Sequence, residues 1–391
     1  MLKVFFPTFD ENGTTKVKPF TPFYLVFFFV GLMNLVGFGQ DPEFTQFFNN
    51  PIHLNPAFAG AYGLQEQPYK APRLILSHRN QWPSMSGQYV TSGVTVDGYV
   101  RGMQGGLAFR AMTDDAARGT LTSTYFGIAY SYRTEVSQKW RMNLALDAGF
   151  FQRHLDWNKL SFRDMIDPGQ GFIFATQDIY RAGQVSGADF KAGGIVYSDK
   201  WTFGVAASHL NQPNESVAGG TSTSIIPIKF TGHVAGTISI KDKPRMQSNL
   251  RPMALFHNQG IQNHFVLGAN FDVEQPSTRS SKFIFSSGFW YRGIAGTTYR
   301  DAFMAYFGFE TEGWKFGYSY DLTASQLTPR TGGAHEITFI GYGRTNDRRK
   351  AFCPGCDEII RNQGEMRIGR FGTRSNYWNG QRIKRKYRAG N

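Results

Sequence analysis

Apolar and polar side chains alternate along WRMNLALDAGF, residues 140–150. Successive side chains of an extended chain point to opposite faces, so Trp140, Leu144 and Phe150 share one face. Asn143 and Asp147 occupy the other. The stretch is about as long as the ten or so residues with which a tilted strand crosses a bilayer. It therefore predicts a strand with one apolar face and one polar face.

Further stretches repeat this pattern, with aromatic side chains at many of their ends: 126–132, 201–208 and 314–322. Between residues 72 and 342, breaks at turn-forming clusters such as 329–333 divide the chain into about 14 segments, an even number as in bacterial outer-membrane barrels. We therefore predict an all-β protein, a transmembrane antiparallel β-barrel. A soluble β-sandwich or propeller would alternate in the same way, and it stands as the alternative.

The composition favours the membrane barrel. Of the 391 residues 16% are aromatic and only 18% are charged, and 44 glycines supply turns and close packing. Strands and the aromatic girdles of outer-membrane barrels use such residues. The mean hydropathy of −0.35 excludes a bundle of transmembrane helices. It does not exclude a barrel, whose lumenal face is polar.

A leader for export precedes the strands. Basic residues up to Lys18 stand before an apolar run from Phe20 to Phe38, and small residues lie next to Gln40. This order of basic, apolar and small residues is typical of a signal peptide, so we expect residues 1–39 to be removed. A retained membrane anchor is the alternative. No later stretch has the roughly 18 apolar residues of a membrane helix, so any further crossing must use strands.

Residues 40–66 form a separate segment before the first strand. DPE at 41–43 has the pattern of a helix start, with a capping aspartate, a proline and an acidic first turn. We expect a short helix that carries three phenylalanines and ends before Pro51, because residues that precede proline avoid the helical conformation. The segment is predicted to be a plug or lip of the barrel, since linkers seldom carry three phenylalanines. Turns are predicted at two Asn-Pro steps, Asn50-Pro51 and Asn55-Pro56.

Four consecutive residues end the first predicted strand: Arg79, Asn80, Gln81 and Trp82. They have two interpretations. Arginine and tryptophan commonly anchor a strand at the membrane interface, and the polar trio could also bond the plug inside the lumen, because buried polar groups must be paired.

Asp156 and Trp157 fall in a long predicted loop. Loops are the usual place for binding residues, but they also fold into caps over a barrel. The pair therefore suits either a folded cap or a partner surface.

His335 and Glu336 come nearest to a catalytic pair. They are adjacent within a predicted strand, so their side chains point to opposite faces. A second histidine at helical spacing is missing, and nothing singles out a nucleophile. We therefore assign His335 a structural role and expect no enzymatic activity, no metal site and no cofactor.

The end of the chain is distinct in charge. Cys353 and Cys356 form a single C-x-x-C pair, which fits a local disulfide, half of a metal site or a redox pair. Residues 344–391 hold 13 Lys and Arg against 4 Asp and Glu, so +9 of the net charge of +13 lies here. This tail is predicted to be a polar extension whose partners are peptidoglycan, lipid headgroups or acidic periplasmic proteins, and not nucleic acid. Its densest basic cluster consists of Arg382, Lys384, Arg385, Lys386 and Arg388.

Seven motifs, in order along the chain, resemble the PorP/SprF proteins of the type IX secretion system of Bacteroidetes. They are QDPEFTQFFNNP (40–51), LNPAFAG (54–60), HRNQWP (78–83), LDWNKL (155–160), SHLNQPN (208–214), GYSYDL (317–322) and GAHEI (333–337). His78 stands where the family usually has tyrosine, and GYSYDL includes Asp321. Family members typically finish soon after a Cys-Pro, here Cys353-Pro354, so the resemblance does not extend to the tail.

The resemblance implies an accessory outer-membrane barrel rather than the main translocation pore. Such proteins are linked to secretion and surface attachment of particular substrates, including gliding adhesins with C-terminal domains of the type B kind. They are also linked to the periplasmic ring of the machinery through a peptidoglycan-binding adaptor, and none is known as an enzyme. The implied partners are therefore the C-terminal domain of a secreted substrate, that adaptor, the ring proteins and outer-membrane lipid.

Four regions are expected: a signal peptide at 1–39, a plug segment at 40–66, an outer-membrane barrel at 67–345 and a basic periplasmic extension at 346–391. An even number of strands would place both termini in the periplasm. The competing function is a channel of the FadL or porin type, in which a polar lumen passes small solutes.

Overall fold

The computed structural model describes residues 41–61, 72–177, 183–217, 224–243, 246–276, 282–294, 300–311, 313–324 and 331–343. All of them belong to one compact unit, Phe38–Asn391. The predicted leader, Cys353, Cys356 and the basic tail lie outside the described residues.

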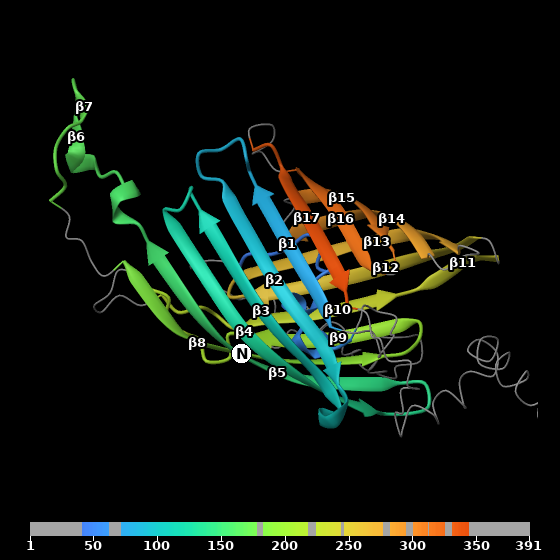
Figure 1. The fold of residues 1–391 in the computed structure, drawn as a ribbon. Coiled ribbons are helices and arrows are strands. Elements are labelled where there is room, and N and C mark those ends of the chain that lie inside the picture. Colours follow the sequence, from blue (N-terminus) through green and yellow to red (C-terminus); the bar gives the residue numbers. More distant parts are fainter. Residues whose placement is uncertain are drawn as a thin grey trace, which may run out of the picture. The chain divides into compact units, whose positions relative to one another are not determined.

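Antiparallel strands close into one ring (Figure 1). Each strand pairs with its neighbours along the chain, and the pairing of β1 with β17 closes the circle. The fourteen strands of the ring are β1 (Arg73–Gln81), β2 (Tyr89–Val100), β3 (Gly105–Ala116), β4 (Leu121–Glu135), β5 (Arg141–Leu155), β8 (Gln184–Tyr197), β9 (Trp201–Ser208), β10 (Lys229–Gly236), β12 (Met246–Gln259), β13 (Gln262–Pro276), β14 (Lys282–Ile294), β15 (Arg300–Glu310), β16 (Trp314–Thr323) and β17 (Ala334–Tyr342). The predicted all-β antiparallel barrel is confirmed, with its number of strands.

Three short strands lie outside this count. β11 (Ile238–Lys243) continues the line of β10 and pairs with β12. β6 (Ile166–Asp167) and β7 (Gly171–Phe172) form a small hairpin of their own within the loop that follows β5.

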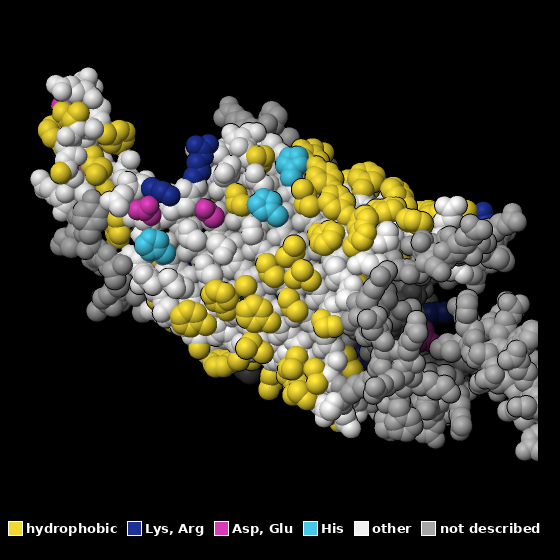
Figure 2. Space-filling view, viewed as in Figure 1, with side chains coloured by type: hydrophobic (Ala, Val, Ile, Leu, Met, Phe, Trp, Pro, Cys, Tyr) yellow, Lys and Arg dark blue, Asp and Glu magenta, His cyan; other side chains and the backbone are white. Residues whose placement is uncertain are grey.

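The two faces of the wall differ as the alternation predicts. In β5 the side chains of Leu144, Leu146 and Phe150 are exposed on the outside, whereas Asn143 and Asp147 point inward and are buried. Figure 2 shows apolar side chains gathered over the outer surface of the strands. An apolar surface of this extent is the one that meets lipid. A soluble sandwich or propeller would bury these side chains, so that alternative is excluded.

A segment without strands, residues 41–61, lies inside the ring. The prediction of a helix that starts at Asp41 is wrong, because α2 (Pro51–Leu54) begins where that helix was expected to end. The 3-10 helix η1 (Pro56–Phe58) follows it. Within the described parts of the chain, no helix is long and apolar enough to cross a membrane.

The wall explains why the first half of this segment is not helical. The backbone amides of Thr45 and Gln46 donate to a carboxylate of β17, and the Asp41 side chain bonds His209. Backbone groups that are satisfied by the wall gain nothing from a helix. Pro51 then occupies the first helical position, where its missing N–H costs no hydrogen bond.

The two ends of the barrel differ in the length of their loops. The loops after β5 and β9 span residues 156–183 and 209–228, and both leave the same end. Turns at the opposite end are short, as at residues 101–104, 136–140 and 198–200. Figure 1 shows β6 and β7 projecting from the first of these ends. We refer to the two as the long-loop end and the short-turn end.

Residues 41–61 run along the lumen from one end to the other. Asp41 bonds His209, which directly follows β9, and Gln259, the last residue of β12. Ala61 accepts a hydrogen bond from Arg73, the first residue of β1. The segment thus starts towards the long-loop end and finishes at the short-turn end, where β1 begins. We refer to it as the plug.

Candidate functional site

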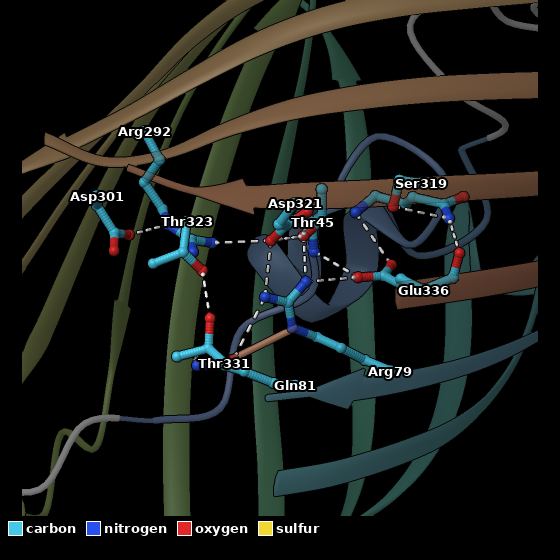
Figure 3. Close-up of polar contacts among 11 residues, drawn as sticks. Thr45, Arg79, Gln81, Arg292, Asp301, Ser319, Asp321, Thr323, Thr331 and Glu336 are labelled. Atoms are coloured by element: carbon cyan, nitrogen blue, oxygen red, sulfur yellow. Dashed lines mark hydrogen bonds and ion pairs between the residues drawn. The ribbon is translucent and has the colours of Figure 1, made fainter. Parts of the chain in front are cut away.

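The plug is bonded to the wall formed by β1, β16 and β17 (Figure 3). The carboxylate of Glu336 accepts hydrogen bonds from the backbone amides of Thr45 at 2.6 Å and Gln46 at 3.0 Å. The Gln46 side chain donates to the Glu336 carbonyl oxygen at 3.0 Å and to Ser319 at 3.2 Å. All four residues are buried, so water does not compete for these bonds. One wall carboxylate therefore anchors the plug backbone directly.

Arg79 lies between two buried carboxylates of this wall. Its guanidinium pairs with Asp321 at 2.8 Å and Glu336 at 3.4 Å, and it donates to Thr45 Oγ1 and to Gln81. The Thr45 hydroxyl donates in turn to Asp321 at 2.8 Å. Without the cation the two carboxylates would repel one another, and removing one partner of a buried pair costs about 3–5 kcal/mol. We refer to Thr45, Arg79, Asp321 and Glu336 as the ionic seat.

Aromatic rings of β14 and β15 hold the next part of the plug. Phe48 stacks on Trp290 with ring centroids 5.3 Å apart and meets Tyr306 edge-on at 4.8 Å. Phe47 meets Trp290 edge-on at 5.3 Å. Such pairs add about 0.5–1.5 kcal/mol each to the burial of the rings. Two of the phenylalanines that distinguish this segment from a linker thus fill the lumen.

Paired charges hold the start of the plug. His209 lies 2.7 Å from Asp41 and 2.9 Å from Asp189, and Lys229 lies 2.7 Å from Glu43. Burial by itself would lower the pKa of His209, but the two carboxylates outweigh it and raise that pKa to about 9. Burial would raise the pKa of Asp41, but the His209 imidazolium outweighs it and holds that pKa well below its usual range. The ion pair between Asp41 and His209 is therefore present at neutral pH.

The wall of β8 and β9, across the ring from the ionic seat, contacts the plug through an amide. Asn55 is fully buried, and its side-chain nitrogen donates to the carbonyl oxygens of Gly194 at 3.2 Å and Val205 at 3.1 Å. Its side-chain oxygen accepts from the amide of Ala57 at 3.0 Å. This one side chain satisfies groups on two strands and caps η1.

The plug touches the wall most closely at the short-turn end. The amide of Gly60 donates to Asp97 at 3.0 Å, and Asp97 pairs with Arg73 at 2.8 Å. Gly106 lies against the plug backbone so closely that a Cβ atom there would stand 2.0 Å from the carbonyl oxygen of Ala59. Only glycine permits this approach.

A cavity remains between the start of the plug and the wall. With its open mouth it encloses about 820 Å³. His209 and Lys229 line it and are paired with the acidic residues of the plug. Lys191 also lines it, and within the described residues it forms no ion pair. The lumen is thus narrowed to a polar, partly cationic recess in front of the plug.

The Asn-Pro residues named from the sequence are all buried in the lumen. Pro51 and Pro56 take the first positions of α2 and η1, and Asn55 bonds its own backbone two residues on. Asn50 makes no such bond. Its side-chain oxygen accepts from the Thr95 hydroxyl at 3.3 Å instead.

Arg79 to Trp82 are divided by the alternation of β1. Arg79 points inward and bonds the plug, and Gln81 accepts from Arg79 at 3.3 Å. Asn80 lies between them on the opposite face. Trp82 directly follows the strand. Its amide donates to the carbonyl of Gly333 at 2.8 Å, and its ring lies edge-on to Tyr89.

Asp156 and Trp157 lie in the long loop and help to fold it. Asp156 caps the 3-10 helix η3 (Trp157–Lys159) by accepting from the amide of Asn158 at 3.1 Å. The ring of Trp157 stacks on Phe162 at 6.2 Å. The base of this loop therefore carries defined local structure.

Asp321, His335 and Glu336 divide between the two faces of the wall. Asp321 and Glu336 are buried in the lumen, whereas His335 is exposed and bonds the Tyr318 hydroxyl at 2.9 Å. Within the described ranges, no group of three His, Cys, Asp or Glu side chains is arranged to hold a metal ion. The ionic seat is an arrangement for holding the plug.

Sequence reasoning did not identify Thr45, Gln46, Ser319 or His209 as plug contacts. The available signal was the position of single charges on the polar faces of alternating strands. That signal marks Asp321 and Glu336 as lumenal. It does not say which lumenal charge meets which, because the members of the seat are up to 291 residues apart.

Fold and site together define a transmembrane β-barrel whose lumen holds its own N-terminal segment. Residues 36–342 match the family described as type IX secretion system membrane protein PorP/SprF. The chain belongs to this family, so it is an outer-membrane component of type IX secretion. The family resemblance seen in the ordered motifs is confirmed.

Solved structures of other outer-membrane proteins are similar at low identity. The toluene transporter TbuX of Ralstonia pickettii has a TM-score of 0.42 and 10% identity, over 76% of this chain and 93% of that chain. BamA from Haemophilus ducreyi lacking POTRA domains 1–3 has a TM-score of 0.34 and 8% identity, over 70% of this chain and 71% of that chain. A comparison with curated proteins found no match.

Proposed function

We propose that this protein is a closed, non-enzymatic accessory barrel that aids secretion or surface anchoring of one particular exported protein. The observation that carries the proposal is the plug, which is bonded to the wall at the ionic seat, at Asn55 and at Gly60. A channel for solutes needs an open path, whereas a docking barrel needs only a stable scaffold. Membership of the type IX family supports the same conclusion.

The orientation follows from the loops. Outer-membrane barrels have short periplasmic turns and longer external loops. The long-loop end would then face the outside, and Tyr342, at the short-turn end of β17, would lead into the periplasm. The basic tail with Arg382 to Arg388 would reach peptidoglycan, lipid headgroups and acidic ring proteins there.

The same orientation revises the expectation for the other terminus. Asp41 lies towards the long-loop end, inside the lumen. A mature chain that begins at Gln40 would therefore start within the barrel, at the side of the cell surface, and only its C-terminus would extend into the periplasm.

The partners proposed are the C-terminal domain of a secreted substrate, of the type B kind, and the periplasmic ring with its peptidoglycan-binding adaptor. Deleting the gene and comparing surface-exposed and secreted proteins tests the first partner. Loss of one or a few exported proteins, with the others retained, supports an accessory role. Loss of all of them, or of none, contradicts it.

The second partner is tested at the tail. A chain that ends at Gly355 should recover fewer ring proteins after mild crosslinking than the full chain. A matched chain in which Arg382, Lys384 and Arg385 are replaced by glutamine separates charge from length. Equal recovery by all three chains contradicts periplasmic docking through the tail.

A solute channel remains the second candidate, and the cavity next to Lys191 is the observation that favours it. Planar-bilayer recordings distinguish the two functions. The purified barrel should stay silent if the plug closes it, whereas a steady open current would support the channel.

A further inference from the structure

The wall of the barrel is incomplete on one flank of the long-loop end. β8 pairs with β5 along its whole length from Gln184, but with β9 only along Ala192–Tyr197. Among the described residues, the strand before Ala192 therefore has a neighbouring strand on one side only. A free edge of this kind is a template for another strand, and natural proteins usually cover or blunt it.

The direction of the free backbone groups follows from the pairing with β5. The amide of Leu155 donates to the carbonyl of Gly183 at 2.6 Å. In an antiparallel ladder bonded residues alternate, so odd-numbered residues of β8 bond β5 and even-numbered residues point away from it. Gln184, Ser186 and Ala188 thus face the open side.

The loop after β9 covers only the lower part of this edge. The amide of Leu210 donates to the carbonyl of Phe190 at 3.0 Å, and the Asn211 side chain donates to the carbonyl of Ala188 at 2.8 Å. Towards the start of β8, no described residue bonds the open-side N–H and C=O groups of Gln184 and Ser186. These groups remain accessible to another backbone.

The free edge stands outside the apolar belt. Gln184, Ser186 and Ala188 are exposed on the outer face, and Phe190 is the first large apolar residue on that face. Lipid does not tolerate unpaired backbone groups, whereas water and proteins do. The edge is therefore placed where an external polypeptide can reach it.

An apolar surface lies in the same loop system. The β6–β7 hairpin and the residues after it expose Ile166, Phe172, Ile173 and Phe174, with Phe172 63% accessible. These residues precede β8 in the chain and project from the same end (Figure 1). Exposed apolar side chains in a cluster mark interaction surfaces. The long-loop end thus carries both a strand with an unpaired edge and an exposed apolar cluster.

We propose that the edge Gln184–Ala188 of β8 is a docking site for an extended strand of an exported protein, which binds by adding itself to the barrel wall. Main-chain hydrogen bonds would supply the affinity, and the exposed apolar side chains the selectivity. Five residues cover about 17 Å, enough for a short strand. The identity of the occupant as an exported protein rests on the proposed function, because only that orientation places the edge at the cell surface.

Photocrosslinking in living cells tests the site. A photoreactive phenylalanine analogue is placed at Ala188, and in a second chain at Gln152, which lies opposite Ser186 in the register on fully paired β5. Adducts with another polypeptide should form at position 188 and not at position 152. Ser186→Pro removes an open-side N–H without removing a bond to β5, and should lower the adduct at position 188 up to about tenfold, as loss of one backbone hydrogen bond predicts. Ser186→Thr, which keeps the N–H, should not.

Each outcome decides a separate point. An adduct with an exported protein supports the site and its occupant, while an adduct with a resident envelope protein overturns the occupant. No adduct, equal adducts at positions 188 and 152, or an adduct only with the β9–β10 loop of the same chain overturns the site. The deletion strain judges the proposed function independently, because it does not depend on the β8 edge. Heat-dependent gel migration confirms that every variant has formed a barrel.

Discussion

Two opposite walls of the barrel hold the same plug by different means. At β1, β16 and β17 the contacts are charged and fully buried, and Arg79 bridges Asp321, Glu336 and Thr45. At β8 and β9 the uncharged amide of Asn55 bonds two strands, and the only charged contact among the described residues is that of Asp41 with His209, at the long-loop end. The first wall resists displacement of the plug because the buried Glu336 carboxylate would lose the two amide donors of Thr45 and Gln46. At the second wall, the part of β8 before Ala192 is paired on one side only.

The difference extends to the strands themselves. β1 is paired along its full length on both sides. β8 has no pairing with β9 in the part that precedes Ala192. The wall that binds the plug at the ionic seat is thus continuous, whereas the opposite wall contains the partly unpaired strand on which the proposed docking site rests.

Removing Arg79 should have the largest effect. Arg79→Ala leaves Glu336 without its cation and Asp321 with only the more distant Arg292 at 3.6 Å, so the free energy of unfolding should fall by about 3–5 kcal/mol. The plug should also be released, which would appear as conductance in planar bilayers. Urea titration in lipid vesicles measures the first effect. Lys315→Ala is the matched control, because Lys315 pairs with Glu310 on the wall; equal conductance from both variants would contradict the ionic seat.

A side chain added at Gly106, where the plug touches the wall at the short-turn end, should have the next largest effect on stability. Gly106→Ala places a Cβ 2.0 Å from the Ala59 carbonyl oxygen, and such overpacking typically costs about 1–3 kcal/mol. Gly232→Ala is the control, since no atom lies within 4 Å of a Cβ at that position. If the two variants unfold at the same urea concentration, the plug does not press on β3.

Replacing Asn55 tests how much the contact of the plug with β8 and β9 contributes to stability. Asn55→Ala leaves the carbonyls of Gly194 and Val205 without this donor, and should lower the free energy of unfolding by about 1–2 kcal/mol. The loss should be smaller than that of Arg79→Ala. Asn258→Ala, which removes an amide bonded to Asn263 away from the plug, should change little. A larger loss at Asn55 than at Arg79 would reverse the comparison of the two walls.

Alkaline pH should weaken the hold on the start of the plug gradually rather than abolish it. The pKa of His209 is raised to about 9 in the folded barrel, above the value of about 6.5 in an unfolded chain. The stability it contributes is therefore complete below about pH 6.5 and is lost as the pH rises through about 9. Urea midpoints of the wild type and His209→Gln should converge above that pH. A difference that stays constant from pH 6 to about 10 would show that the Asp41 pair adds no pH-dependent stability.

Alternation along single strands was enough to predict much of the site's chemistry. It placed Asp147 on the polar face and His335 and Glu336 on opposite faces. The Phe-rich composition of residues 44–48 predicted a plug, but the helix expected there was wrong. A helix-start pattern reports local preference, whereas the wall carboxylate that binds Thr45 and Gln46 comes from the other end of the chain.

The sequence by itself determined the β-strands and their number, because the period of two and the length of the segments are local properties of the chain. It also determined which side chains face lipid and which face the lumen. Only the tertiary structure decided that Arg79 pairs with Asp321 and that the plug starts at the long-loop end. It also decided that β8 extends beyond the part that pairs with β9. These facts depend on pairings between residues far apart in the chain, and neither hydropathy nor local propensity carries information about such pairings.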